Sequence, residues 1–249
     1  MNKAVFGDSF KRTAALARRE IYSYCISPVF YGMGVFFLLF VNIWLFYFQH
    51  FFVQDMASFR SWFAAFPLAF IIVIPAITMK SWAEERRGGT LELLLTMPFS
   101  EWNLVLGKFT AALAVLAVFL LLTLPLPLSI LPMGDFDGGI LLGEYAGVLF
   151  LGAAAVSLGL FFSSISRNQA GAFLGGAVVL LITVLINQVP QVLNLPRFLA
   201  DFINFFSLTF HFESFSRGIL DSRDLAFFVL STLLFLFLNT RVLIFRKWR

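Results

Sequence analysis

Six long apolar runs constrain the fold of this 249-residue chain more than any other feature of its sequence. A helix rises 1.5 Å per residue, so about 20 residues cross the ~30 Å hydrocarbon layer of a membrane. The runs show none of the inside–outside alternation that strands of a membrane barrel require. The sequence therefore predicts an all-α, polytopic membrane protein with six transmembrane helices, over residues 29–48, 59–79, 104–131, 140–165, 170–189 and 225–245.

Composition agrees with this class. Hydrophobic residues make up 60% of the chain and charged residues 13%, whereas a soluble domain carries about 25% charged residues. Most of the surface must then face lipid, because water would otherwise meet a continuous apolar skin. The net charge of +4 is spread over the connections between runs, so we expect no nucleic-acid partner. The single cysteine, Cys25, excludes an intrachain disulfide.

The positions of the basic residues predict the orientation of the helices. Fourteen of the 18 Lys and Arg residues fall on one side: Lys3, Lys11, Arg12, Arg18, Arg19, Lys80, Arg86, Arg87, Lys108, Arg167, Arg241, Arg246, Lys247 and Arg249. The other four, Arg60, Arg197, Arg217 and Arg223, fall on the opposite side. The positive-inside rule then places both termini and the loop after the second helix in the cytoplasm. The first run is too long for a signal peptide, and none is expected.

Residues 1–28 have a pattern of their own. Apolar residues recur every three or four positions at Phe6, Phe10, Ala14, Ala17, Ile21 and Tyr24. Lys11, Arg12, Arg18 and Arg19 lie elsewhere on the helical wheel, and Pro28 ends the segment. This predicts an amphipathic helix at the cytoplasmic membrane interface. A plain topogenic segment is the alternative.

Residues 80–103 predict a short helix on a cytoplasmic loop. Thr90 follows Gly88-Gly89 as a suitable N-cap, and Glu92 falls in the first turn, where the helix dipole favours an acid. Leucines at 91, 94 and 95 form an apolar face, and Pro98 ends the helix. Such an element either lies on lipid headgroups or docks into the groove of a partner.

The same loop resembles the signature loop of ABC-2 type permeases. The resemblance rests on Glu84-Glu85-Arg86, Gly89-Thr90-Leu91-Glu92, Leu94-Leu95, Pro98, Ser100 and Gly107-Lys108. It implies a permease subunit of an ATP-driven exporter, formed by a single transmembrane domain over residues 1–249. In that family the short helix sits in a cleft of a separate ATPase. The residues expected to couple to the ATPase are Glu84, Glu85, Arg86, Gly89, Thr90, Leu91, Glu92 and Leu94.

Two further segments are similar to the gliding-motility GldF-type branch of this family, with the NosY-type branch as the near alternative. They are residues 207–224 and the pairs Ser163-Ser164 and Asn168-Gln169. The resemblance covers nearly the whole chain in order and spacing. It implies a bacterial inner-membrane location, a second permease copy or homologous permease, and an accessory GldG-like subunit. It also implies that ATP and Mg are bound by the partner ATPase, with no cofactor on this chain.

The source of energy, which is either ATP hydrolysis or an ion gradient, distinguishes the main classes of transporter. The one Gly-Lys pair, Gly107-Lys108, lacks the upstream glycine of a phosphate-binding loop, so the chain is not expected to be an ATPase or any other enzyme. The middles of the six runs contain no charged residue or His, which argues against ion coupling. Lys108 lies near a run's end, from which its stem could reach the interface. A membrane anchor or scaffold of a motility or envelope complex, and an intramembrane enzyme, are the alternatives.

Polar residues elsewhere suggest secondary sites. Asn42, Asn187 and Gln188 could line a transport path, although hydrogen bonding between helices explains them as well. Residues 190–224 are expected to form short helices at the extracytoplasmic interface. Within them Phe210, His211 and Glu213 are candidates for an outer gate, with a packed extracellular cap as the alternative. No metal site is expected there, because a third ligand is missing.

Overall fold

The structure, a computed structural model, describes residues 3–49, 58–90, 100–134, 136–218 and 221–247. Its elements are α1 (Lys3–Ile26), α2 (Pro28–Ile43), the π-helix η1 (Trp44–Phe48), α3 (Arg60–Phe63), α4 (Ala65–Arg87), α6 (Glu101–Thr123), α7 (Pro125–Ile130), the 3-10 helix η3 (Leu131–Met133), α8 (Gly138–Ile165), α9 (Gln169–Leu185), the 3-10 helix η4 (Ile186–Gln188), α10 (Val189–Val192), α11 (Arg197–Asn204), α12 (Leu208–Phe215) and α13 (Ser222–Lys247). Within the described ranges every regular element is helical, so the predicted all-α fold is confirmed.

Six helical segments are long and apolar enough to cross a membrane. They are Pro28–Phe48, Arg60–Arg87, Glu101–Ile130, Gly138–Ile165, Gln169–Val192 and Ser222–Arg246. Each contains most of one predicted run, which confirms the six-helix prediction. The second segment extends eight residues beyond the predicted end at 79, because α4 continues without a break to Arg87.

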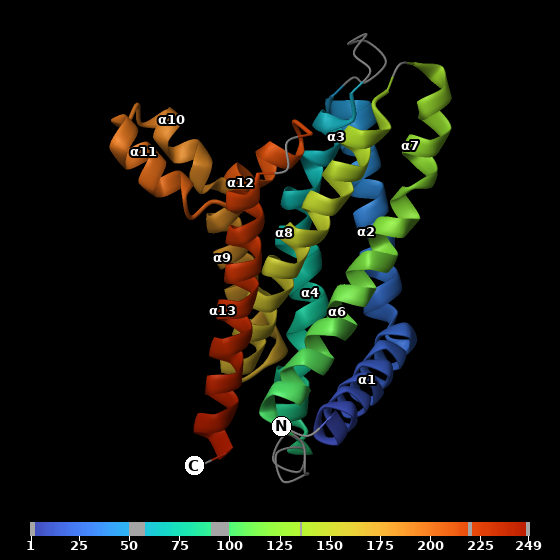
Figure 1. The fold of residues 1–249 in the computed structure, drawn as a ribbon, viewed down its shortest axis with the longest axis vertical. Coiled ribbons are helices and arrows are strands. Elements are labelled where there is room, and N and C mark those ends of the chain that lie inside the picture. The colour runs from blue at the N-terminus through green and yellow to red at the C-terminus, as the bar shows by residue number, and fades with distance from the viewer. Residues whose placement is uncertain (1–2, 50–57, 91–99, 135, 219–220, 248–249) are drawn as a thin grey trace.

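Both chain termini lie at one end of the helix bundle, here called the terminal end (Figure 1). The end of α4 and the start of α6 lie there too, whereas α10, α11 and α12 lie at the opposite end. Short helices were expected within residues 190–224, and α10, α11 and α12 occupy this region, at the end of the bundle away from both termini. An even number of membrane crossings places both termini at the same end of the bundle.

The helices α4 and α8 form the centre of the bundle. About 72% of the apolar window of the α4 segment and 67% of that of α8 are buried, against 22% for the first and fifth segments. Aromatic side chains fill the space around α4. Phe37 of α2 lies 5.5 Å, between ring centroids, from Phe66 and 6.2 Å from Phe119 of α6. The face of α2 that carries Phe37 is thus fixed to the core, and its other faces are exposed.

Small residues let neighbouring helices approach α8 closely. A Cβ added to Gly147 would lie 2.6 Å from the Cβ of Phe215 on α12, and one added to Gly152 would overlap Leu116 of α6. Another, at Gly159, would overlap Thr78 of α4. The glycines of this helix therefore serve packing, as small residues do between membrane helices.

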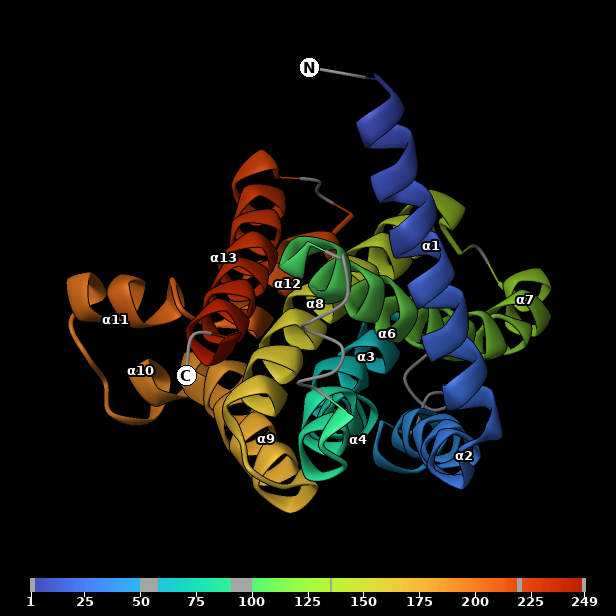
Figure 2. The same cartoon turned by 90° about the horizontal axis from the view of Figure 1, so that it is seen from below.

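The amphipathic prediction for residues 1–28 corresponds to α1. This helix packs along α6 and lies beside the bundle at its terminal end (Figure 2). Leu16 is buried against the bundle, whereas Ala14, expected on the apolar stripe, is exposed. The packed face of α1 therefore runs through Leu16, Glu20 and Tyr24. It includes the charged Glu20 because Lys108 of α6 pairs with it, and a search for apolar residues alone does not detect such a contact.

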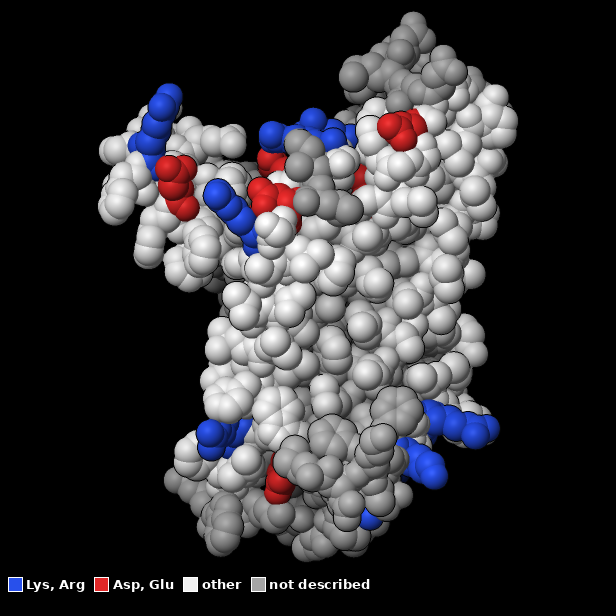
Figure 3. All heavy atoms as spheres, viewed as in Figure 1, with Lys and Arg blue, Asp and Glu red and all other residues white. Residues whose placement is uncertain are grey.

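Charged side chains gather at the two ends of the molecule. On the face shown in Figure 3, Lys, Arg, Asp and Glu occupy both ends, and a broad uncharged band lies between them. Hydrocarbon excludes charge, so this band is where a bilayer would surround the bundle. The protein is accordingly a multi-pass membrane protein.

Candidate functional site

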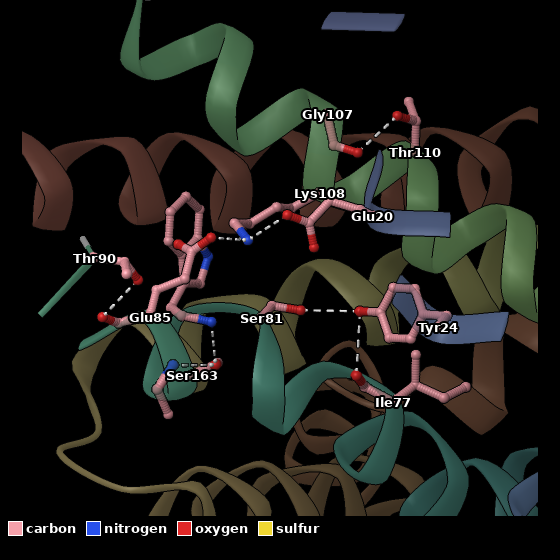
Figure 4. A network of polar contacts seen from close by, with 12 residues as sticks. Glu20, Tyr24, Ile77, Ser81, Glu85, Thr90, Gly107, Lys108, Thr110 and Ser163 are labelled. Carbon is pink, nitrogen blue, oxygen red and sulfur yellow. Dashed lines mark hydrogen bonds and ion pairs between the residues drawn. The ribbon is translucent and has the colours of Figure 1, made fainter. Parts of the chain in front are cut away.

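Residues near the end of α4 and the start of α6 meet α1 in a polar cluster at the terminal end (Figure 4). Three helices contribute: the last turns of α4, the second turn of α6, and the C-terminal half of α1. We call the group formed by Glu20, Glu85, Lys108 and Trp82 the Lys108 cluster. It lies where the chain leaves α4 and re-enters the bundle through α6.

Lys108 is enclosed at the centre of this cluster. It is 2% exposed, and its Nζ donates to Glu20 Oε1 at 3.0 Å and to Glu85 Oε1 at 2.9 Å. The ammonium also lies 4.9 Å from the ring centroid of Trp82. The expectation that its stem reaches outward is wrong, because two carboxylates from other helices bind the charge inside the protein. One cation therefore joins α1, α4 and α6.

The close approach of α1 depends on Gly107, the neighbour of Lys108. A Cβ at this position would lie 2.6 Å from Leu16 Cδ2, closer than real Cβ contacts come. The missing side chain lets α1 lie against α6, and this brings Glu20 within reach of Lys108. The Gly107-Lys108 pair is therefore a helix-docking feature.

Tyr24 adds a second link between α1 and α4. Its hydroxyl donates to the carbonyl oxygen of Ile77 at 3.2 Å and lies 3.0 Å from Ser81 Oγ. Part of the ring is exposed, but the hydroxyl lies among protein atoms, and this burial raises the pKa of Tyr24 above its ordinary value. The phenol therefore stays protonated and keeps donating at physiological pH.

The same end of α4 is bound to α8. Ser163 Oγ accepts a hydrogen bond from the Trp82 backbone N–H at 3.1 Å and donates to the carbonyl oxygen of Met79 at 3.1 Å. Arg86 donates to the carbonyl oxygen of Ser166 at 3.0 Å, which satisfies a carbonyl just beyond the end of α8. Ser163, singled out in the sequence only through resemblance, thus joins two central helices.

The structure places five of the eight expected coupling residues together, and the other three, Leu91, Glu92 and Leu94, lie outside the described residues. Glu84 and Thr90 are exposed, Glu85 belongs to the Lys108 cluster, and Arg86 contacts the end of α8. Gly89 has a φ of 69°, a conformation that favours glycine, just past the end of α4. Thr90 Oγ1 donates to the Glu85 carbonyl oxygen at 3.2 Å. The N-cap hydrogen bonds predicted for Thr90 involve residues outside the described ranges, so this role stays a prediction.

The three candidates for a transport path do not come together. Asn42 donates to the carbonyl oxygen of Leu38 in its own helix at 2.6 Å. Asn187 and Gln188 lie in η4 near the opposite end, with Gln188 exposed. Hydrogen bonding within the helix is therefore the role seen for Asn42.

The candidates for an outer gate are all on α12 but face different surroundings. His211 is buried, with Nδ1 2.6 Å from Asp224 Oδ1 of α13 and Nε2 3.1 Å from the carbonyl oxygen of Phe205. Phe210 is 42% exposed, and Glu213 forms a partly exposed ion pair with Arg217 at 3.4 Å. His211 thus fixes α12 to α13, which supports a packed cap at this position.

Sequence reasoning missed two acids. Glu20 was not recognised as a partner of Lys108, although it is the one acid in a basic stretch of α1. Glu144 of α8 is 1% exposed, and its Oε1 has no hydrogen-bond partner among the described residues. A carboxylate five residues into an apolar run was the available signal for Glu144.

Comparisons with known proteins place these features in a family context. A family model described as ABC-2 family transporter protein matches residues 14–247. A protein named probable multidrug ABC transporter permease YbhR, from Escherichia coli strain K12, is 31% identical over 129 residues, which are 51% of this chain and 34% of that protein. The YbhR of Escherichia coli O157:H7 matches with the same figures. The match thus spans about a third of the length of these relatives.

Proposed function

Because the chain belongs to the ABC-2 family of transporter proteins, we propose that it is a permease subunit that forms a translocation pathway and couples to a separate ATPase. The coupling surface is the segment from Glu84 through residue 94, which includes the last turn of α4 and the first part of the connection to α6. The ATPase binds ATP and Mg, and this chain binds neither. The family and the named permease relative support this assignment.

The observation that carries the coupling proposal is the Lys108 cluster. In the sequence Glu85 precedes residues 91–99 and Lys108 follows them, and the two side chains form an ion pair at 2.9 Å that joins α4 to α6. Glu20 adds α1 to the same ion-pair group. A displacement of the connection by an ATPase therefore moves α4, α6 and α1 together. The ATPase can shift the permease from one conformation to another only if its interaction energy with the two conformations differs. The contacts of the Lys108 cluster are proposed to persist or break together during this shift.

The coupling proposal requires that both termini and the Lys108 cluster lie on the cytoplasmic side of a bacterial inner membrane. The location of both termini and of the α4–α6 connection at one end of the bundle supports it. The basic residues of the sequence are biased to the same side. The short helices α10 to α12 are then extracytoplasmic.

We further propose that two permease copies, or this chain and a homologue, assemble side by side. The segments Pro28–Phe48, Gln169–Val192 and Ser222–Arg246 have only 22%, 22% and 28% of their apolar windows buried, which suits contact with lipid or with a second permease. The cargo is proposed to be amphiphilic, since the middles of the spans carry no charge and the relative's name refers to multiple drugs. Membership of the GldF-type branch and a GldG-like accessory subunit are finer proposals that rest on residues 207–224 and on the pairs Ser163-Ser164 and Asn168-Gln169.

Site-directed cross-linking tests the coupling proposal. Cys25 is the single cysteine and is exposed, so the chain is first changed by Cys25→Ser. Glu84→Cys in this background is then combined with single cysteines along the cleft of the co-expressed ATPase. Phe198→Cys on exposed α11 is the matched control at the opposite end. We expect cross-links from residue 84 alone, and cross-links from residue 198, or from neither position, would contradict the proposal.

A further inference from the structure

A pocket of ≈ 450 Å³ opens between α1 and α4 beside the Lys108 cluster. Its lining includes Arg19 and Ser27 from the α1–α2 side and Lys80 and Glu84 from α4, with Lys108 behind them. The pocket lies at the terminal end, where the uncharged band of the protein begins. A ligand there would sit at the boundary between hydrocarbon and water.

Three of the charged residues that line this pocket, Arg19, Lys80 and Glu84, take part in no ion pair among the described residues, and Lys80 and Glu84 carry opposite charges on one helix. Lys80 is half-buried, and Nζ contacts Ser27 Oγ at 3.0 Å. Among the described residues neither Lys80 nor Glu84 takes part in an ion pair, either with the other or with a third residue. They are four residues apart on α4, which places their Cβ atoms about 5–6 Å apart on one face. The pocket thus presents an unpaired cation and an unpaired anion one helical turn apart.

The two charges follow one another along α4. Glu84 is nearer the end of α4 and is exposed, whereas Lys80 lies one turn deeper. Beyond Lys80 the pocket adjoins an apolar crevice of only ≈ 10 Å³, lined by Val29, Phe30, Ile77 and Val115. Tyr24, Ser27 and Lys80 line both spaces. From the surface inward the order is therefore anion, cation, apolar crevice.

We propose that this pocket binds the headgroup of a zwitterionic aminophospholipid, phosphatidylethanolamine. The ammonium lies at Glu84 and the phosphate at Lys80 and Ser27, and the acyl chains extend into the surrounding bilayer. The order of groups in this lipid matches the order on the protein. The charged residues lining the pocket are three cations, Arg19, Lys80 and Lys108, and three carboxylates, Glu20, Glu84 and Glu85. A zwitterion leaves that balance unchanged, whereas an anionic lipid adds uncompensated negative charge.

Native mass spectrometry of the purified full chain tests this site after reconstitution into nanodiscs of phosphatidylethanolamine, phosphatidylcholine or phosphatidylglycerol. We expect retained phosphatidylethanolamine, and about a tenfold loss of retention in Lys80→Gln, because a hydrogen bond to a charged group is removed. Lys80→Arg should restore binding. Lys11→Gln, an exposed residue of α1 outside the pocket, is the control and should bind as the unchanged chain does.

The second charge and the source of the phosphate are tested separately. Glu84→Gln should remove the preference for phosphatidylethanolamine over phosphatidylglycerol, because only the former carries an ammonium. Glycerophosphoethanolamine and inorganic phosphate, which lack acyl chains, should not displace the lipid. Equal retention of all three lipids, unchanged retention in a folded Lys80→Gln chain, or displacement by inorganic phosphate would each overturn the proposal. Thermal unfolding of each variant establishes that it is folded.

Discussion

Replacing Lys108 with Met tests the Lys108 cluster most sharply, because Met keeps the length of the side chain and removes its charge. The change leaves Glu20 and Glu85 facing one another without the cation. Their side chains are 15% and 18% exposed, whereas that of Lys108 is 1% exposed. Breaking a buried pair by removing one partner costs about 3–5 kcal/mol. The partial exposure of both carboxylates lets water recover part of this, so we expect about 2–3 kcal/mol of lost stability.

Single changes of the acids should cost less than loss of Lys108. Glu20→Gln leaves the Glu85–Lys108 pair balanced in charge, and the Gln carbonyl oxygen can still accept from Lys108, so weakening this hydrogen bond should cost about 1 kcal/mol. The triple change Lys108→Met, Glu20→Gln, Glu85→Gln removes all three charges and should be more stable than Lys108→Met alone. The triple change is expected to be the more stable because it removes the unpaired carboxylates, and a difference in packing is not the cause.

Hydrogen exchange and thermal unfolding measure these effects together. In Lys108→Met the backbone amides of the C-terminal half of α1 should exchange faster, since α1 loses its ionic link to α6. Lys11→Met, an exposed change on the same helix, is the control. The reasoning is refuted if Lys108→Met unfolds and exchanges like the unchanged chain, or if the triple change is less stable than Lys108→Met.

Three further changes test other contacts. Gly107→Leu should cost about 1–3 kcal/mol by overpacking against Leu16, and Leu16→Ala should restore part of the thermal stability; no rescue would contradict the contact. Ser163→Ala should cost about 1 kcal/mol and speed exchange of the amides at residues 82 and 83, whereas unchanged exchange there would show that Ser163 does not join α4 to α8. Asp224→Asn should weaken the bond to His211 and increase proteolysis near α12, and equal cleavage of both chains would argue against this link.

The helical spans could be predicted closely because their signal is local. Membrane thickness sets the length of each run, and apolar composition marks it, so residues 140–165 correspond to α8 at Gly138–Ile165. The end of α4 was missed because polar residues after 79 carry no hydropathy signal. That stretch stays helical because Ser163 and Arg86 bind it to α8.

The candidate site could be predicted only in part. Resemblance located Glu85 and Arg86 at the loop, but their contacts depend on residues far along the chain, and no local pattern joins Glu20 to Lys108 across 88 positions. The contact between His211 and Asp224 could not be predicted either, because helical spacing does not show whether α13 places an acid beside the histidine. Pairings between helices of this kind require the packed structure.

The ratio of cargo moved to ATP hydrolysed tests the coupling account most directly. The permease and its ATPase would be reconstituted in vesicles with a fluorescent amphiphile, and Glu20→Gln compared with the Lys11→Gln control. The account predicts that Glu20→Gln retains the ATPase and hydrolyses ATP but moves less cargo per ATP, because the ionic link of α1 to Lys108 is lost and α1 follows α4 and α6 less closely. An unchanged ratio in Glu20→Gln, with the same amount of ATPase bound, would contradict it.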